Sequence, residues 1–275
     1  MKNEKKEINE TKETKETKEK HAHRTPNAFM LDDAASDFSR VEAYKAIRTN
    51  IMYSLPKSDT GKVIMVTSSI PNEGKTTNSI NLALTFAQTG LRVVLVDCDL
   101  RKPRVHRYLK MQLGEGVSNY ICGYAEYDKV LQKDLPQGFD LITAGEIPPN
   151  PTEILASERF SELIERLKSE YDYIFLDTPP VTVVADAAIV SASASGVVVV
   201  VKADFTTYDV LDQTVESLNK VDAKIFGFIL TNTAAKNSSR RYERYKYKYY
   251  NDHYGDRYGD RYGDHYSDHY VSENE

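Results

Sequence analysis

The chain has 275 residues, a net charge of −5 and two cysteines, Cys98 and Cys122. The mild acidic balance argues against a dedicated nucleic-acid binder, whose domain is usually basic, and the cysteines lack metal-type spacing, which indicates a reducing compartment. No apolar run is long enough to span a bilayer or to form a secretory signal, so we expect a cytoplasmic protein that reaches a membrane only through a partner.

The two ends of the sequence differ in composition from the middle. The first 25 or so residues are mostly Lys, Glu and Thr, and the last 40 are mostly Tyr, Asp, Arg, Lys, His and Gly. Such segments bury too little apolar surface to offset the entropy of ordering them, so we expect disordered tails at 1–36 and 236–275. Residues 37–235 remain, and their number suits one substantial α/β domain.

Short β-branched runs alternate with longer amphipathic stretches in this middle part. Near-continuous apolar runs such as VVLVD and YIFLD are typical of parallel strands covered on both faces. A first helix is expected at 39–54, followed by strands at 63–67, 93–97, 139–143, 173–177, 197–202 and 225–231 and helices at 76–88, 153–169, 184–193 and 208–220. This order predicts a doubly wound, mainly parallel α/β sheet, whose ligands bind at the carboxyl ends of its strands.

The first expected strand leads into a loop close to the phosphate-binding pattern G-x-x-x-x-G-K-[ST]. Gly74, Lys75 and Thr76 fit the pattern, whereas Ser69 stands at the first glycine position without removing the backbone N–H donors. Those donors and the helix N-terminus would hold phosphate, to which Lys75 adds positive charge. The hydroxyl of Thr76 would bind Mg²⁺. The alternative is an ordinary strand-to-helix turn that contains Gly-Lys-Thr by chance.

Two later strand ends carry acidic residues. Asp97 and Asp99 leave their strand on the same side, followed by Arg101, and Asp177 ends the run YIFLD. One carboxylate of such a pair can organise metal-bound water while the other accepts a proton, although D-x-D can also merely cap a helix. Asp177 fits the acidic residue that holds Mg²⁺ on the partner strand of a phosphate loop, or it is a solvated residue before a proline turn.

The loop, the D-x-D pair and Asp177 together resemble the Walker A, A′ and Walker B motifs of the bacterial tyrosine kinases (BY-kinases) of capsule and exopolysaccharide systems. The resemblance covers about residues 37–235 and implies the deviant P-loop ATPase fold. MinD/ParA-like positioning ATPases of that fold carry a lysine early in the loop, where this chain has Ile70. That difference favours the kinase over the ATPase, and the intact carboxylates argue against a scaffold that binds ATP without turnover.

The resemblance also implies ATP and Mg²⁺ as cofactors and assigns residue roles. Lys75, Asp97 and Asp99 would be catalytic, with Asp97 the candidate base for the tyrosine hydroxyl, and Thr76, Asp99 and Asp177 would bind Mg²⁺. Asn72 stands where family members commonly have glycine, but asparagine tolerates left-handed backbone angles, so we expect the loop to survive. The implied ATP contacts are Ser69, Pro71, Asn72, Glu73, Gly74, Lys75, Thr76, Thr77 and, at the purine, Asn232.

A helix before the first strand carries E-x-x-R-x-x-R in this family and holds subunits in a ring. The matching residues here are Glu42, Lys45 and Arg48, which lie along one helix face. Lys45 lacks the planar guanidinium with which arginine contacts a carboxylate at two points. Without the resemblance, we would interpret this face of the helix as solvated.

The resemblance also implies partners. They are copies of the same chain, with a ring expected, and a membrane adaptor of the polysaccharide co-polymerase type that recruits the kinase to the inner face of the membrane. No nucleic-acid partner is expected.

Tyrosine dominates the C-terminal segment. From Tyr250 it recurs every fourth residue, and each of the last five tyrosines has an Asp two residues before it. Three glycines in the same repeat disfavour a helix, and about 40 flexible residues reach about 35 Å, enough to find a neighbouring subunit. In the kinases that the chain resembles, such a cluster is autophosphorylated in trans. The expected sites are Tyr242, Tyr245, Tyr247, Tyr249, Tyr250, Tyr254, Tyr258, Tyr262, Tyr266 and Tyr270.

Other roles remain open for the charged segments. The tail could bind a metal nonspecifically through its histidines or associate with itself or with RNA by stacking, and the basic run at 236–248 could touch an anionic membrane. A second basic cluster follows the D-x-D pair and consists of Arg101, Lys102, Arg104, His106 and Arg107. It suits phosphate binding, activator docking or solubility, and the sequence alone does not choose among these roles.

Overall fold

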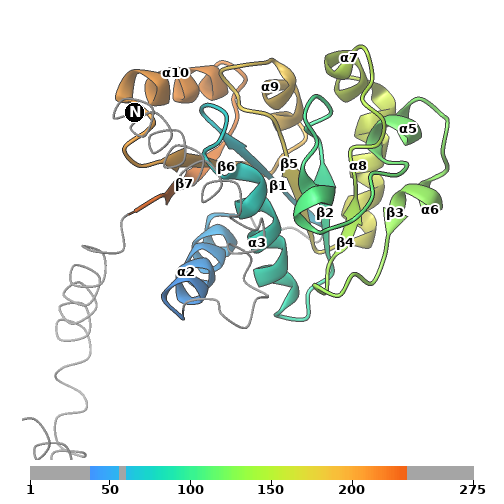
Figure 1. Ribbon diagram of the computed structural model, residues 1–275, viewed down its shortest axis with the longest axis horizontal. Coiled ribbons are helices and arrows are strands. Elements are labelled where there is room, and N and C mark those ends of the chain that lie inside the picture. The colour runs from blue at the N-terminus through green and yellow to red at the C-terminus, as the bar shows by residue number, and fades with distance from the viewer. Residues whose placement is uncertain (1–37, 56–59, 234–275) are drawn as a thin grey trace, which may run out of the picture. The chain divides into compact units, whose positions relative to one another are not determined.

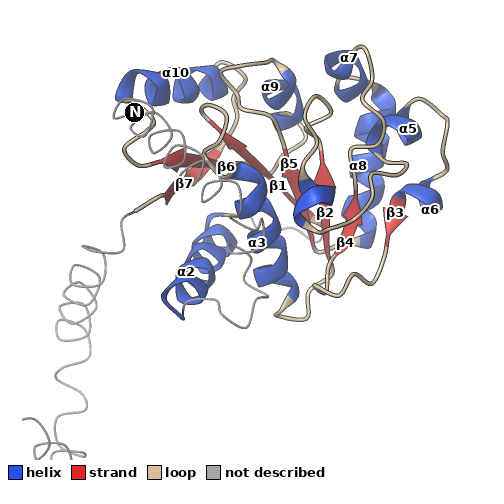
Figure 2. Ribbon diagram, viewed as in Figure 1, coloured by secondary structure: helices blue, strands red, loops and turns tan. Residues whose placement is uncertain are grey.

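One seven-stranded sheet organises the described part of the chain. The computed structural model describes residues 38–55 and 60–233, and the chain divides after Thr231 into two units, of which the second is described only at 232 and 233. The strand order is β3-β4-β2-β5-β1-β6-β7, and only β3 runs antiparallel to its neighbour (Figures 1 and 2). The strands are β1 Lys62–Ser68, β2 Val93–Asp97, β3 Leu131–Gln132, β4 Asp140–Ile142, β5 Tyr173–Asp177, β6 Gly196–Lys202 and β7 Ile225–Thr231. The expected mainly parallel α/β sheet is thus confirmed.

Alternate side chains of the central strands form two separate cores, one on each face of the sheet. In β1, Val63 and Met65 belong to one core, whereas Ile64 and Val66 belong to the other. The Ile64 face is covered by α2 Phe38–Ser54, α3 Lys75–Ala87 and α4 Val105–Tyr108. The Val63 face is covered by α5 Val117–Ile121, α6 Tyr127–Val130, α7 Pro151–Leu155, α8 Glu158–Glu170, α9 Asp186–Ser191 and α10 Tyr208–Asn219. Helices on both faces explain why the strands read as continuous apolar runs.

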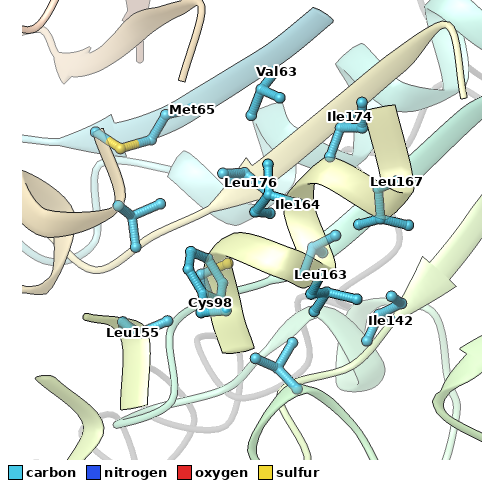
Figure 3. Packing of buried hydrophobic residues seen from close by; sticks show 14 of the residues in the cluster. Val63, Met65, Cys98, Ile142, Leu155, Leu163, Ile164, Leu167, Ile174 and Leu176 are labelled. Carbon is cyan, nitrogen blue, oxygen red and sulfur yellow. The ribbon is translucent and has the colours of Figure 1, made fainter. Parts of the chain in front are cut away.

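Helix α8 shows how a regular apolar spacing becomes a buried face. Its buried residues recur every three or four positions, which places them on one stripe of the helix. Leu163, Ile164 and Leu167 lie in the same core as Ile174 and Leu176 of β5 (Figure 3). This stripe holds β5 in the middle of the sheet, and the carboxyl end of β5 carries Asp177.

The structure departs from the sequence-based expectation in several short elements. The single helix expected at 153–169 is two helices. The first ends at Leu155 with Ala156 as its C-cap, and Ser157 caps α8 by accepting a hydrogen bond from the N–H of Phe160. Strand β4 and helix α9 are shorter than expected, and α4, α5, α6 and β3 were not expected at all. Each of the unexpected elements has two to five residues, too few to show a helical or strand period.

Phe86 of α3 offers a test of the core on the face that carries α3. It is fully buried, and its ring centroid lies 4.6 Å from that of Tyr173 and 5.1 Å from that of Phe175. We expect Phe86→Ala to lower the free energy of unfolding by about 3–5 kcal/mol in urea denaturation, because it leaves a cavity among packed rings. Phe228→Ala is the control, since Phe228 is 50% exposed. Equal losses from the two changes would contradict this assignment of the core.

Candidate active site

The loop between β1 and α3 has the backbone conformation of a tight turn into a helix. Gly74 is the N-cap of α3 with a φ of 97°, and Asn72 has a φ of 69°. Asparagine therefore occupies the left-handed region at the position where the sequence raised a doubt, as expected. Ser69 is buried, its carbonyl accepts a hydrogen bond of 2.5 Å from the hydroxyl of Thr182, and within the described residues its own hydroxyl has no partner.

Glu73 fastens the loop to the ends of two strands. Its side chain is buried, and one carboxylate oxygen accepts a hydrogen bond of 2.8 Å from the N–H of Ile70. The other oxygen accepts hydrogen bonds from the hydroxyl of Thr206 and, at 3.3 Å, from the N–H of Lys202. The hydroxyl of Thr231 also donates to the carbonyl of Glu73, at 2.9 Å. Glu73 was predicted to contact ATP, and its carboxylate is occupied by protein donors that hold the loop in place.

Three strand ends meet at the start of α3, as the parallel sheet requires. Asp97 and Asp177 end β2 and β5 and lie opposite each other in register. The ammonium of Lys75 lies 2.9 Å from a carboxylate oxygen of Asp99 and 3.7 Å from one of Asp177. Asp177 also accepts hydrogen bonds of 2.7 Å from Thr76 and 2.9 Å from Ser79, one turn further along α3. The structure thus brings together all five residues predicted for catalysis and Mg²⁺ binding.

The two acidic residues of the D-x-D pair have different surroundings. Asp97 is fully buried, and its oxygens accept hydrogen bonds from the N–H groups of Asp99 at 3.1 Å and Val105 at 3.3 Å. Asp99 lines the cleft described below, and one of its oxygens accepts a hydrogen bond of 3.0 Å from the N–H of Lys102. Asp97 is not among the residues that line the cleft. The residue predicted to act as the base is therefore a buried side chain that does not itself face the cleft.

The electrostatics of this cluster favour an added cation. Burial, followed by repulsion from Asp177, raises the pKa of Asp97 to about 8, and burial also raises the pKa of Asp177. Burial alone would lower the pKa of Lys75, but Asp177 and Asp99 outweigh it and hold that pKa above its ordinary value. One ammonium therefore faces three carboxyl groups. A divalent cation would balance their charge.

The donor set suits Mg²⁺ bound together with phosphate. Within the described ranges, no group of three or more His, Cys, Asp or Glu side chains is arranged to hold a metal by itself. Mg²⁺ commonly takes one or two protein oxygens and completes its shell with water and substrate phosphates. Asp177 and the hydroxyl of Thr76 supply such oxygens at the foot of the loop.

A cleft of about 390 Å³ opens above this cluster, within the usual range for a small-molecule site. Of the predicted site residues, Pro71, Asn72, Gly74, Lys75, Thr76 and Asp99 line it. Ser69, Glu73 and Thr77 do not line it, and Asn232 follows β7 with a φ of 59° in the second unit. Three other lining residues, Arg101, Lys102 and Arg104, belong to the basic cluster whose role the sequence left open. The remaining ones, for which no site was predicted, are Tyr108, Pro179, Pro180, Val183 and Val184. The two prolines follow Asp177 within three residues, so their place at a strand end was a usable signal.

Arg101 is held at the rim of the cleft by a buried acid. Its guanidinium contacts Asp186 at two points, at 2.7 and 3.0 Å, and it donates to the hydroxyl of Thr152 at 2.8 Å. Thr152 in turn donates to Asp186 at 2.7 Å. Burial alone would raise the pKa of Asp186, but the hydrogen bonds from Arg101 and Thr152 hold it below its ordinary value. The pair comes from residues 85 positions apart, and no sequence spacing signals it.

Helix α2, predicted to contact neighbouring copies, also touches the loop from within the same chain. Lys45 pairs with Glu42 at 2.8 Å, but Arg48 donates to the carbonyl of Thr85 at 2.7 Å and so fastens α2 to α3. Tyr44 donates at 2.8 Å to Asn78, whose amide donates at 2.9 Å to the carbonyl of Gly74. The oligomer contacts stay a prediction. The ten predicted phosphorylation sites lie outside the described residues.

Comparisons with known proteins identify relatives of this chain. The AAA domain family matches residues 61–229. The tyrosine-protein kinase YwqD of Bacillus subtilis is 36% identical over 69% of this chain and 79% of its own length. The tyrosine-protein kinase Etk of Escherichia coli is 35% identical over 80% of this chain, but the chain spans only 30% of that protein's length. The solved kinase domain of Etk matches with a TM-score of 0.71 and 34% identity over 78% of this chain and 84% of that domain.

Glu73→Ala should weaken ATP binding without any lost contact to ATP, because the loop loses the carboxylate that binds Lys202 at the end of β6, Thr206 and the N–H of Ile70, while the main-chain contact to Thr231 of β7 stays. We also expect the free energy of unfolding to fall by about 1–3 kcal/mol, since buried donors such as the N–H of Ile70 lose their acceptor. Titration with a fluorescent ATP analogue and urea denaturation measure the two effects. Glu162→Ala, at an exposed position of α8, is the matched control. Unchanged ATP affinity in Glu73→Ala would refute the anchoring role.

The Arg101–Asp186 pair predicts a pH dependence of stability. Because the pKa of Asp186 is lowered on folding, its carboxylate stabilises the fold above its unfolded pKa, and this stabilisation is lost as pH falls through the folded pKa. The loss of unfolding free energy in Asp186→Asn should therefore be largest near neutral pH and shrink below about pH 4. The exposed Asp212→Asn should show a small, flat difference over the same range. A constant effect of Asp186→Asn across this range would argue against the lowered pKa.

Proposed function

The chain belongs to the family of bacterial tyrosine kinases, and from this premise we propose that it is an ATP-dependent protein-tyrosine kinase that phosphorylates tyrosines of its own C-terminal segment. The observation that carries the proposal is that Lys75, Thr76 and Asp99 line the loop end of one cleft and that the buried Asp177 contacts both Lys75 and Thr76. A phosphate loop, an ammonium and carboxylates at that place suit phosphoryl transfer, which depends on positioning and charge stabilisation. The kinase names of YwqD and Etk support the same class of reaction.

Each residue of the cluster has a separate task in this proposal. The N-terminus of α3 and the ammonium of Lys75 bind the phosphates of ATP, and Thr76 with Asp177 and Asp99 holds the metal. Mg²⁺, when bound, would draw negative charge from the phosphate oxygens. Arg101 stays at the rim because Asp186 and Thr152 fix its guanidinium.

The transfer itself needs a proton acceptor. The tyrosine oxygen forms a bond to the γ-phosphorus as the bond to the ADP oxygen breaks, and the phenolic proton passes to a carboxylate. Asp97 is the predicted acceptor, and it lies at the end of β2 beside Asp99, from whose N–H it accepts a hydrogen bond. Asp99 is the second candidate, because it lines the cleft while Asp97 lies behind it.

The proposed setting is the control of capsule or exopolysaccharide synthesis or export. No helix in the described ranges is both long and apolar enough to cross a membrane. We propose recruitment from the cytoplasm to the inner face of the membrane by an adaptor of the polysaccharide co-polymerase type. Assembly into a ring would use the α2 face that carries Glu42 and Lys45, which are paired with each other in the single chain.

Peptide mass spectrometry after incubation with Mg·ATP tests the proposed activity. Phosphate should appear within residues 242–270 of the wild type and not in Lys75→Met, because the variant lacks the ammonium that binds the phosphates. Circular dichroism of the variant controls for its folding, and a candidate adaptor's cytoplasmic peptide is added in parallel. An unmodified tail in both preparations, with ATP still hydrolysed by the wild type, would instead support the positioning ATPase.

A further inference from the structure

Two unpaired basic side chains line the cleft beside the catalytic cluster. Lys102 and Arg104 both line it and are exposed, and in the part of the chain that the structure describes no carboxylate forms an ion pair with either. The other two basic residues of the cleft are already neutralised, Lys75 by Asp99 and Arg101 by Asp186. The rim of the cleft therefore carries a net positive charge. The proposed binding of ATP and the metal gives no role to Lys102 and Arg104, which supply this charge.

The rim is tied directly to the D-x-D pair. The N–H of Lys102 donates to Asp99 at 3.0 Å, and the N–H of Val105 donates to Asp97 at 3.3 Å. The backbone that carries Lys102 and Arg104 is thus fixed at both ends by these two carboxylates. The backbone from which the two positive side chains extend therefore has a set position relative to Asp97 and Asp99.

The ten tail tyrosines fall into two groups by the charge two residues before them. Asp precedes the last five at this position, as Asp252, Asp256, Asp260, Asp264 and Asp268. Of the first five, only Tyr245 has an acidic residue there, Glu243, and the segment around them is rich in Lys and Arg. Charge complementarity therefore favours the last five at a positive rim.

An extended peptide would present Tyr and the preceding Asp to the same surface. Side chains two residues apart point to the same face and lie about 7 Å apart along the chain. The residue between them is Arg or His in all five cases, and in an extended peptide it would point to the opposite face. A tyrosine that enters the cleft would thus place its Asp, and not the neighbouring cation, against the rim.

We propose that Lys102 and Arg104 select tyrosines that follow an Asp by two residues, so that Tyr254, Tyr258, Tyr262, Tyr266 and Tyr270 of another copy are the preferred substrates. This inference rests on the proposed kinase function and adds a specificity to it. Ion pairs at an exposed rim are weak and screened by salt, so the preference is about threefold to tenfold in kcat/KM at low ionic strength.

The first test changes only the substrate. An isotopically labelled full chain carrying Lys75→Met serves as substrate for the wild-type kinase, and initial phosphorylation is measured at each tyrosine by mass spectrometry. Changing the five Asp residues to Asn should slow phosphorylation of the last five tyrosines about threefold to tenfold. The matched control changes the intervening residues His253, Arg257, Arg261, His265 and His269 to Gln, and it should leave their rates within about twofold, because these side chains face away from the rim.

The second test exchanges the charges. A kinase with Arg104→Glu keeps Lys102, so these two rim positions carry no net charge. It should lose the wild-type order and phosphorylate the unaltered substrate and one whose five Asp residues are changed to Lys at rates within about twofold of each other. Arg107→Glu is the control for net charge, since Arg107 is an exposed residue of α4 that does not line the cleft. That variant should keep the wild-type preference for Asp.

The outcomes separate this inference from the function on which it rests. Equal rates for the Asp and Asn substrates, or an unchanged order in Arg104→Glu, would overturn the selection by Lys102 and Arg104 and leave the kinase function in place. Earlier phosphorylation of Tyr242, Tyr247 and Tyr249 than of the last five tyrosines would also overturn it. A substrate that gains no phosphate at any tyrosine would overturn both proposals.

Discussion

A single ammonium among three buried carboxyl groups is the interaction on which the site depends. The parallel register of β2 and β5 places Asp97 opposite Asp177, and the turn after β2 adds Asp99. The ammonium of Lys75 contacts Asp99 and Asp177, and its positive charge offsets part of the repulsion among the three carboxylates at this edge of the sheet. A cation that enters with phosphate completes the balance, which links the stability of this edge to ligand binding.

The loop that delivers Lys75 is held by polar contacts from several directions. Glu73 ties it to β6 and β7, Thr182 ties the carbonyl of Ser69, and Asn78 links Gly74 to Tyr44 of α2. These contacts explain how the loop can keep its shape with Ser69 and Asn72 where glycines are common in the pattern and in the family. Two successive hydrogen bonds, from Tyr44 to Asn78 and from Asn78 to Gly74, therefore connect α2 to the phosphate loop. Helix α2 is the helix predicted to contact other subunits.

The cleft combines an acidic floor with a basic rim. The carboxylates and the hydroxyl of Thr76 at the floor would hold a metal that binds with phosphate, and the rim suits acidic groups of a peptide that approaches from solvent. The same two carboxylates join both regions, because Asp97 and Asp99 accept the N–H groups that position the rim. In the proposed mechanism, selection of a peptide and transfer of phosphate would therefore depend on one connected piece of backbone.

The sequence by itself determined the sheet, its strand ends and the residues that meet there. Apolar runs of strand length specify a parallel sheet, three of them lead into Asp97, Asp177 or the glycine-lysine-threonine turn, and the geometry of the sheet gathers those ends at one edge. This reasoning found Lys75, Thr76, Asp97, Asp99 and Asp177. It could not find the inward role of Glu73, the burial of Asp97 behind Asp99, or the Arg101–Asp186 pair. Those features depend on contacts between residues far apart in the chain, and a local pattern carries no information about which distant donor a side chain will face. Only the tertiary structure decided them, because packing of the helices on the sheet fixes which polar groups are buried together.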